Sequence, residues 1–189
     1  IEAIIIPDKR PAIDIRRGTF EVTHQLWRHF GTDQRLRANI EKAIRSVGRV
    51  ELPGHPQLPY GGTAFVVGKG LLMTNRHVAE IFTSGLGIRG LRFIEGHRAG
   101  FDPIREIDSP PNGRILDVRA VRMVHPYWDM ALLAVEGLDA AIEPLRLSVS
   151  EPPPGRDVAV IGYPAFDPRN NAAVQLEVFR NVFDVKRLQ

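Results

Sequence analysis

The feature that most constrains the fold is a succession of short apolar or alternating segments after residue 48, separated by turn residues. Pro- and Gly-rich stretches at 53–62, 108–113 and 151–155 lie between several of them. Segments 63–67 and 71–74 flank a Gly-Lys-Gly turn and predict a β-hairpin. Many short strands with frequent turns favour a mostly β barrel or sandwich. The predicted strands are 49–52, 63–67, 71–74, 91–95, 115–124, 130–135, 158–163 and 174–185.

The first 46 residues differ, and we expect them to form an extended arm followed by amphipathic helices. Pro7, Pro11 and alternating isoleucines before residue 18 suit an arm. Thr32 and Asp33 are good N-cap residues for a second helix. Apolar residues recur with helical spacing at Val22, Leu26, Trp27 and Phe30, and again at Leu36, Ile40, Ile44 and Val47. This stripe is expected to pack on the following domain, or alternatively on a partner protein.

Composition excludes several classes of protein. The chain has 189 residues, which suits one domain with an appendage, and no cysteine, which excludes disulfide scaffolds and thiolate sites. No apolar run approaches the ~18 residues of a membrane span, and the start at Ile1 shows no secretory leader. The compartment cannot be deduced from these features, because cysteine-free chains occur in several compartments.

The positive charge is concentrated near the N-terminus. Residues 1–50 carry ten Lys and Arg against six Asp and Glu, a net +4, whereas residues 51–189 carry fifteen against sixteen. A basic segment of this kind can contact nucleic acid or an acidic partner, although a solvated helical face is the simpler explanation. Nucleic-acid binding is not expected for the β-rich part.

Two segments carry residues suited to chemistry. In Thr74-Asn75-Arg76-His77-Val78, a histidine follows a predicted strand where the chain is expected to enter a short helical turn. In Asp129-Met130-Ala131-Leu132-Leu133, an aspartate immediately precedes an apolar strand. A carboxylate at the mouth of a buried strand needs a hydrogen-bond donor, and an imidazole N–H is a suitable one.

These segments resemble the trypsin-like (chymotrypsin-fold) serine peptidases, in particular the bacterial branch without disulfides. A third segment, 158–164, ends in the Gly-Tyr-Pro of that family. The resemblance implies a double antiparallel β-barrel, with a peptidase domain at 47–189 that is incomplete at its C-terminus, and with 1–46 as the helical extension. It implies that His77 is the general base and that Asp129 orients it, at a separation of 52 residues against about 45 in the chymotrypsin template. It implies protein or peptide substrates, no membrane, and neither metal nor cofactor.

The nucleophilic serine of that family is the missing element. It is expected in a Gly-x-Ser-Gly loop about 90 residues after the aspartate. None of the five serines lies in a glycine-flanked turn: Ser46, Ser84, Ser109, Ser148 and Ser150. We therefore expect a serine endopeptidase whose serine lies in a C-terminal remainder of the same protein, with a fused effector domain as a further possibility. The alternatives are a non-catalytic homologue that binds or regulates proteins, and an unrelated β-domain.

Overall fold

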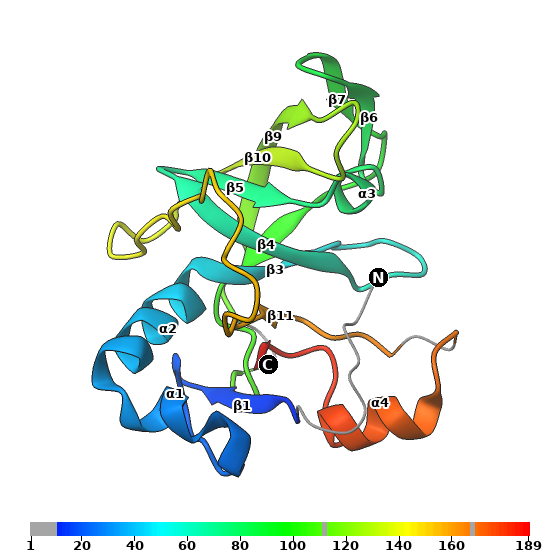
Figure 1. Cartoon of the computed structure of the whole chain (residues 1–189). Coiled ribbons are helices and arrows are strands. Elements are labelled where there is room, and N and C mark those ends of the chain that lie inside the picture. Colours follow the sequence, from blue (N-terminus) through cyan, green and yellow to red (C-terminus); the bar gives the residue numbers. More distant parts are fainter. Residues whose placement is uncertain (1–10, 111–112, 167–168) are drawn as a thin grey trace.

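Six strands between residues 47 and 135 close into an antiparallel barrel, in the order β10-β5-β4-β3-β8-β9 (Figure 1). The computed structural model describes residues 11–110, 113–166 and 169–189. The barrel strands are β3 (Val47–Glu51), β4 (Tyr60–Gly68), β5 (Leu71–Thr74), β8 (Gly100–Asp102), β9 (Leu116–Val124) and β10 (Ala131–Val135). The mostly β architecture that the sequence predicted is confirmed.

The barrel core follows from the alternation of side chains along these strands. Ala64, Val66, Leu72 and Leu133 are fully buried and pack in one cluster. Gly48 lies on β3 where the ring of Phe101 crosses it, and a Cβ at this position would collide with that ring. A glycine is therefore required here for the close approach of β3 and β8.

The predicted hairpin at 63–74 is confirmed, since β4 pairs with β5 from Ala64–Thr74 to Gly68–Leu71. Gly70 has φ +64°, a conformation that glycine adopts without steric cost. After β5 the chain forms α3 (Arg76–Ala79) and then a separate hairpin, β6 (Thr83–Leu86) and β7 (Arg89–Phe93). Gly87 and Val124 exchange two backbone hydrogen bonds of 2.8 and 2.9 Å, which fasten this hairpin to the barrel.

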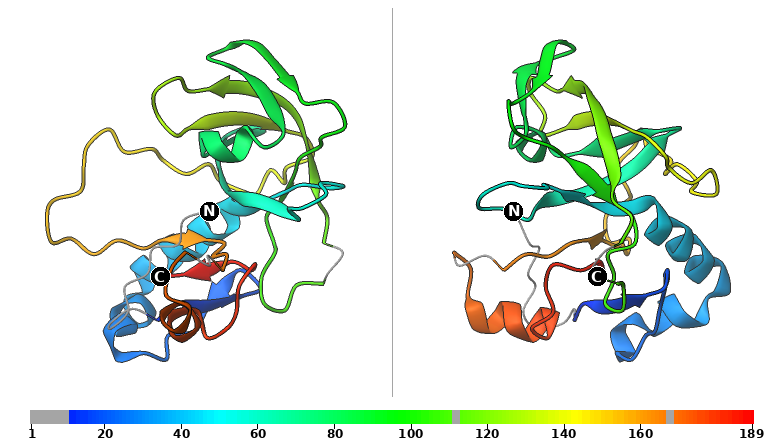
Figure 2. Two further views of the ribbon diagram at one scale, coloured as in Figure 1. Left: turned by 90° about the vertical axis from the view of Figure 1, so that its right-hand side faces the viewer. Right: turned by 180° about the vertical axis from the view of Figure 1, so that it is seen from behind.

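A second, four-stranded sheet lies below the barrel, in the order β11-β12-β1-β2 (Figures 1 and 2). It combines β1 (Ile13–Arg16) and β2 (Thr19–Phe20) with β11 (Ile161–Gly162) and β12 (Arg187–Leu188). Ile13 pairs with Leu188, so strands from both ends of the chain are direct neighbours. The sequence did not predict this pairing. The division into an appendage at 1–46 and a peptidase domain at 47–189 stays a prediction.

The N-terminal helices pack on this sheet, as expected from their apolar stripe. They are η1 (Gln25–Trp27), α1 (Arg28–Thr32) and α2 (Gln34–Ser46). Trp27, Phe30, Ile40 and Ile44 are buried in one cluster with strand residues of β1, β2 and β12. Two details of the prediction are wrong. Val22 precedes the helices rather than lying on the first of them, and Leu26 remains 48 % exposed.

The predicted strand at 174–185 is also wrong, because this segment contains α4 (Ala172–Phe179). Asn171 caps the helix, its side chain accepting a hydrogen bond from the Val174 N–H. Val178 and Phe179 are buried against Ala12, which places the helix beside the start of β1. The β-branched and aromatic residues that suggested a strand serve here as the packing face of a helix.

A buried polar network connects the two parts of the molecule. Lys186 is fully buried and donates hydrogen bonds to the carbonyls of Ile44 (2.9 Å) and Pro103 (2.5 Å), with Glu106 Oε1 at 3.5 Å. The backbone N–H of Gly18 donates to the other oxygen of Glu106 at 2.8 Å. Desolvation lowers the pKa of Lys186 to about 8, although Glu106 opposes the shift. Four separate segments therefore meet around the Lys186–Glu106 pair.

Candidate active site

His77 is placed by the transition from β5 to α3. β5 ends at Thr74, whose hydroxyl donates to the Thr63 carbonyl of the neighbouring β4 at 2.7 Å. Asn75 then takes an extended conformation as the N-cap of α3, and His77 follows in the first turn of that helix. The predicted sequence of strand, polar turn and short helix around the histidine is confirmed.

Asp129 is placed by a tight loop between β9 and β10. The ring Nδ1 of His125 accepts hydrogen bonds from the backbone N–H groups of Tyr127 (3.2 Å) and Trp128 (2.9 Å). The His125 and Trp128 rings stack, with centroids 4.6 Å apart. Arg76 donates to the carbonyls of His125 and Pro126 at 3.3 and 3.0 Å. These bonds hold the loop beside α3 and orient the aspartate toward it.

His77 and Asp129 meet across these two elements. Nδ1 of His77 lies 2.7 Å from Oδ2 of Asp129, and the His77 backbone N–H donates to Oδ1 at 2.9 Å. The two side chains are 48 % and 47 % exposed, so the pair lies at the surface of the barrel and open to solvent. The carboxylate thus contacts both the ring and the backbone of one residue.

The environment of Asp129 favours its ionised form. Partial desolvation raises the pKa of the carboxyl group, but hydrogen bonds from the backbone and ring of His77 and from Asn75 outweigh it, so that the pKa is lowered overall. A carboxylate that is ionised can only accept hydrogen bonds. Nδ1 of His77 must therefore carry the proton, and Nε2 is left as the unprotonated nitrogen of the neutral ring.

Two neighbours of the pair were not predicted as site residues. Asn75 Nδ2 lies 3.1 Å from Oδ2 and 3.3 Å from the backbone oxygen of Asp129. Arg76 holds the loop as described above and forms an ion pair with Glu80 at 3.5 Å. The polar Asn75-Arg76 dipeptide between an apolar strand and His77 was the available signal, although polar residues at a helix start are ordinarily explained by capping.

The Gly-Tyr-Pro segment packs against the barrel wall rather than beside the His–Asp pair. The Tyr163 N–H donates to Thr63 Oγ1 at 3.2 Å, and its hydroxyl lies 3.5 Å from the Asp102 carbonyl. Tyr163 is buried, and desolvation together with nearby Asp102 and Glu106 raises its pKa well above the usual value. This residue is therefore part of the buried interface between barrel and second sheet.

The serines are engaged elsewhere. Ser46 Oγ donates to the Glu143 carbonyl at 2.6 Å, and Ser84 Oγ accepts from Arg92 at 3.2 Å. Ser109 Oγ accepts from the Glu106 N–H at 2.9 Å. Ser148 Oγ donates to the Ser150 carbonyl and accepts from the Ser150 N–H, so that Ser150 takes part through its backbone. Among the described residues, none of the five hydrogen-bonds to the ring of His77.

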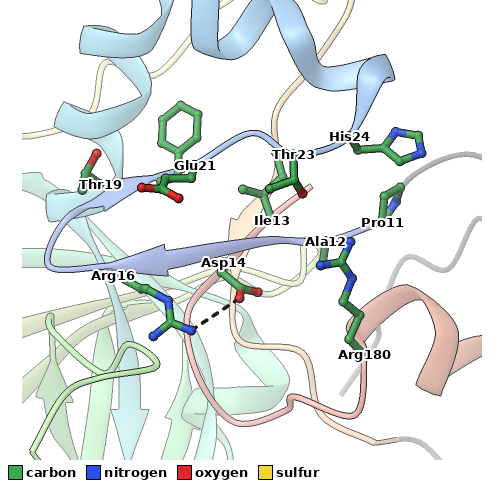
Figure 3. A pocket seen from close by; sticks show the side chains of 11 residues that line it. Pro11, Ala12, Ile13, Asp14, Arg16, Thr19, Glu21, Thr23, His24 and Arg180 are labelled. Carbon is green, nitrogen blue, oxygen red and sulfur yellow. Dashed lines mark ion pairs between the residues drawn. The ribbon is translucent and has the colours of Figure 1, made fainter.

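A cavity of about 330 Å³ lies in the other part of the molecule, between β1, β2 and the end of α4 (Figure 3). Asp14 and Arg16 form an ion pair of 3.7 Å and line this cavity together with His24 and Arg180 (Figure 3). None of its lining residues belongs to the His–Asp pair. Within ranges 11–110, 113–166 and 169–189, no cluster of three potential metal ligands occurs, and no helix is long and apolar enough to cross a bilayer.

Comparison with known families identifies the domain. The family model of the trypsin-like peptidase domain matches residues 62–184, which include both His77 and Asp129. The chain belongs to the trypsin-like peptidase family. The closed six-stranded barrel agrees with the barrel fold of such peptidases. A peptidase domain takes proteins or peptides as its substrates. No curated protein matches this trypsin-like peptidase domain in a sequence search.

Proposed function

We propose that this trypsin-like domain is the His- and Asp-bearing part of a serine endopeptidase, in which His77 is the general base and Asp129 its orienting partner. The observation that carries the proposal is the 2.7 Å contact between His77 Nδ1 and Asp129 Oδ2, on residues 52 apart in the sequence. A serine hydroxyl is a weak nucleophile until an adjacent base removes its proton. The pair supplies that base with its orientation fixed.

The chemistry follows from the proton positions. With Nδ1–H donated to Asp129, Nε2 of His77 accepts the proton of a serine hydroxyl as the hydroxyl oxygen attacks the peptide carbonyl carbon. The same Nε2–H then protonates the leaving amine, and the cycle repeats with water to hydrolyse the acyl-enzyme. Asp129 stays ionised throughout and stabilises the imidazolium that forms.

The proposed nucleophile lies in a segment that follows residue 189 in the complete protein. Support comes from the order His, Asp, Ser along chymotrypsin-like chains. Further support comes from the hydrogen bonds that engage the hydroxyls of Ser46, Ser84, Ser109 and Ser148. The oxyanion hole and the pocket that selects the cleaved residue would come from the same segment.

A fluorophosphonate probe directed at activated serines tests this proposal. The longer protein that includes the segment after residue 189 is expected to be labelled, whereas the 189-residue chain alone is not. In the longer protein, His77→Ala should abolish labelling and cleavage. Asp129→Asn should leave the fold intact and lower kcat by about 10⁴, the size of the same change in the chymotrypsin template.

Ser84→Ala and Ser150→Ala in the longer protein are matched controls, because they remove hydroxyls that the proposal leaves without a role. They should retain full labelling. Normal turnover of the His77→Ala enzyme would contradict the proposal. Absence of any labelling in the longer protein would favour a non-catalytic homologue that binds or regulates other proteins.

A further inference from the structure

Asn75 occupies the N-cap of α3 but does not cap the helix. An N-cap Asn or Asp ordinarily accepts a hydrogen bond through its side-chain oxygen from the second or third helical N–H. Asp33 does so for α2, and Asn171 does so for α4. The side chain of Asn75 makes no such bond.

Asp129 takes over that bond from across the site. Its Oδ1 accepts from the N–H of His77, the second residue of α3, at 2.9 Å. Asn75 in turn directs its amide group to Asp129, 3.1 Å from Oδ2 and 3.3 Å from the backbone oxygen. An ionised carboxylate and a carbonyl have no proton to donate, so the NH₂ end of Asn75 must face Asp129. At this helix start, Asp129 therefore acts as the acceptor for the helix N–H, and the N-cap residue Asn75 acts as a donor to Asp129.

The geometry points to Asn75 as a positioning residue for the proposed catalytic pair: its amide holds both the carboxylate and the backbone of Asp129, so that Oδ2 faces His77 Nδ1. This inference rests on the proposed function. Oδ2 is shared between His77 and Asn75, while Oδ1 is held by the His77 backbone. Each carboxylate oxygen thus has a donor on α3 or its cap, and rotation of the carboxylate would break both sets of bonds.

The substitution Asn75→Asp separates positioning from capping. Asp is as good an N-cap as Asn, so a capping role predicts a stable protein with an unchanged pair. Under the positioning role, the new carboxylate replaces a donor with a like charge and repels Asp129. The control is Asn171→Asp, at a position where the side chain already acts as an acceptor and where both roles predict no change.

The measurements use NMR on the 189-residue chain, because they require no nucleophile. The downfield proton signal of His77 Nδ1–H reports the bond to Asp129, and the carboxyl carbon of Asp129 reports its pKa. In Asn75→Asp we expect the proton signal to be lost and the pKa of Asp129 to rise, with a smaller rise in Asn75→Ala. Asn171→Asp should match the unsubstituted chain.

Wild-type signals in Asn75→Asp would overturn the inference. If that variant does not fold, Asn75→Ala decides: an unchanged Asp129 pKa together with lower thermal stability would show a merely structural role. In the longer protein, Asn75→Ala should lower kcat by about 10-fold to 100-fold with little change in KM, which is the size of one hydrogen bond to a charged group. If the proposed function fails, there is no activity to measure. The NMR result on the 189-residue chain would still decide whether Asn75 positions Asp129.

Discussion

At the scale of single residues, the carboxylate of Asp129 is held in one orientation by hydrogen bonds from a single short segment, residues 75–77. Three donors, the Asn75 amide, the His77 backbone and the His77 ring, lie within 2.7–3.1 Å of its two oxygens. They outweigh the desolvation of a half-exposed group and keep its pKa low. His77 and Asp129 were identifiable from their flanking motifs. Asn75 was not, because an Asn before a helix is ordinarily its N-cap, and only the folded structure shows its side chain bonded to Asp129 instead.

The lowered pKa of Asp129 predicts an acid-dependent contribution to stability. Because the folded-state pKa lies below the ordinary 3.8, the unfolded chain binds the proton more readily. The contribution is fully present well above pH 3.8 and is lost as the pH falls through the folded-state value. Urea unfolding of the wild-type chain and Asp129→Asn from pH 6 to pH 2 should show the difference shrinking toward the acid end. A difference that grows on acidification would contradict this assignment.

At the scale of elements, the sequence predicted caps and turns more reliably than it predicted whether an apolar segment is a helix or a strand. The hairpin at 63–74 and the start of α2 at Asp33 were predicted because local chemistry determines them: a glycine with positive φ, and a side chain that accepts the Leu36 N–H at 3.0 Å. The segment 174–185 is rich in valine and phenylalanine, which favour strands, but the structure buries Val178 and Phe179 against Ala12 from a helix.

The cap of α2 gives a direct test at this scale. Asp33→Ala removes the acceptor for the Leu36 N–H, and we expect the free energy of unfolding to fall by about 1 kcal/mol. Asp33→Ser should restore most of it, since serine is an equally good N-cap. Denaturant unfolding of the three proteins measures the effect. A loss in Asp33→Ser as large as in Asp33→Ala would show that the charge, not the cap, is responsible.

At the scale of the whole molecule, barrel and second sheet are joined through buried polar groups as well as apolar ones. Arg49 and Glu51 form a buried ion pair of 2.5 Å on β3, and Arg49 also donates to the Asp184 carbonyl at 2.7 Å. The Tyr60 hydroxyl donates to the Asp184 carboxylate at 2.5 Å. No sequence pattern predicts such a network, because its members are brought together from distant segments and their charges resemble ordinary surface residues.

Lys186 makes this interface sensitive to alkaline pH. Its pKa is about 8 in the folded chain against 10.5 ordinarily, so between these values the unfolded chain binds the proton and the folded chain does not. The free energy of unfolding therefore rises with pH in this window, by about 3 kcal/mol for Lys186 alone. Lys186→Met cannot titrate and should lack this increase. Unfolding of both proteins from pH 7.5 to 10.5 measures the difference, and parallel pH profiles would refute it.

The pairing of Ile13 with Leu188 also affects the order in which the two sheets can form during synthesis. All six barrel strands lie between residues 47 and 135, so the barrel has every partner it needs soon after its last strand leaves the ribosome. β1 is made before the barrel and yet has to wait for β12, which is made more than 170 residues later. Until then the apolar face of the helices at 25–46 lacks the side chain of Leu188 as part of its cover. During synthesis the second sheet is therefore completed only after the barrel strands are available to pair.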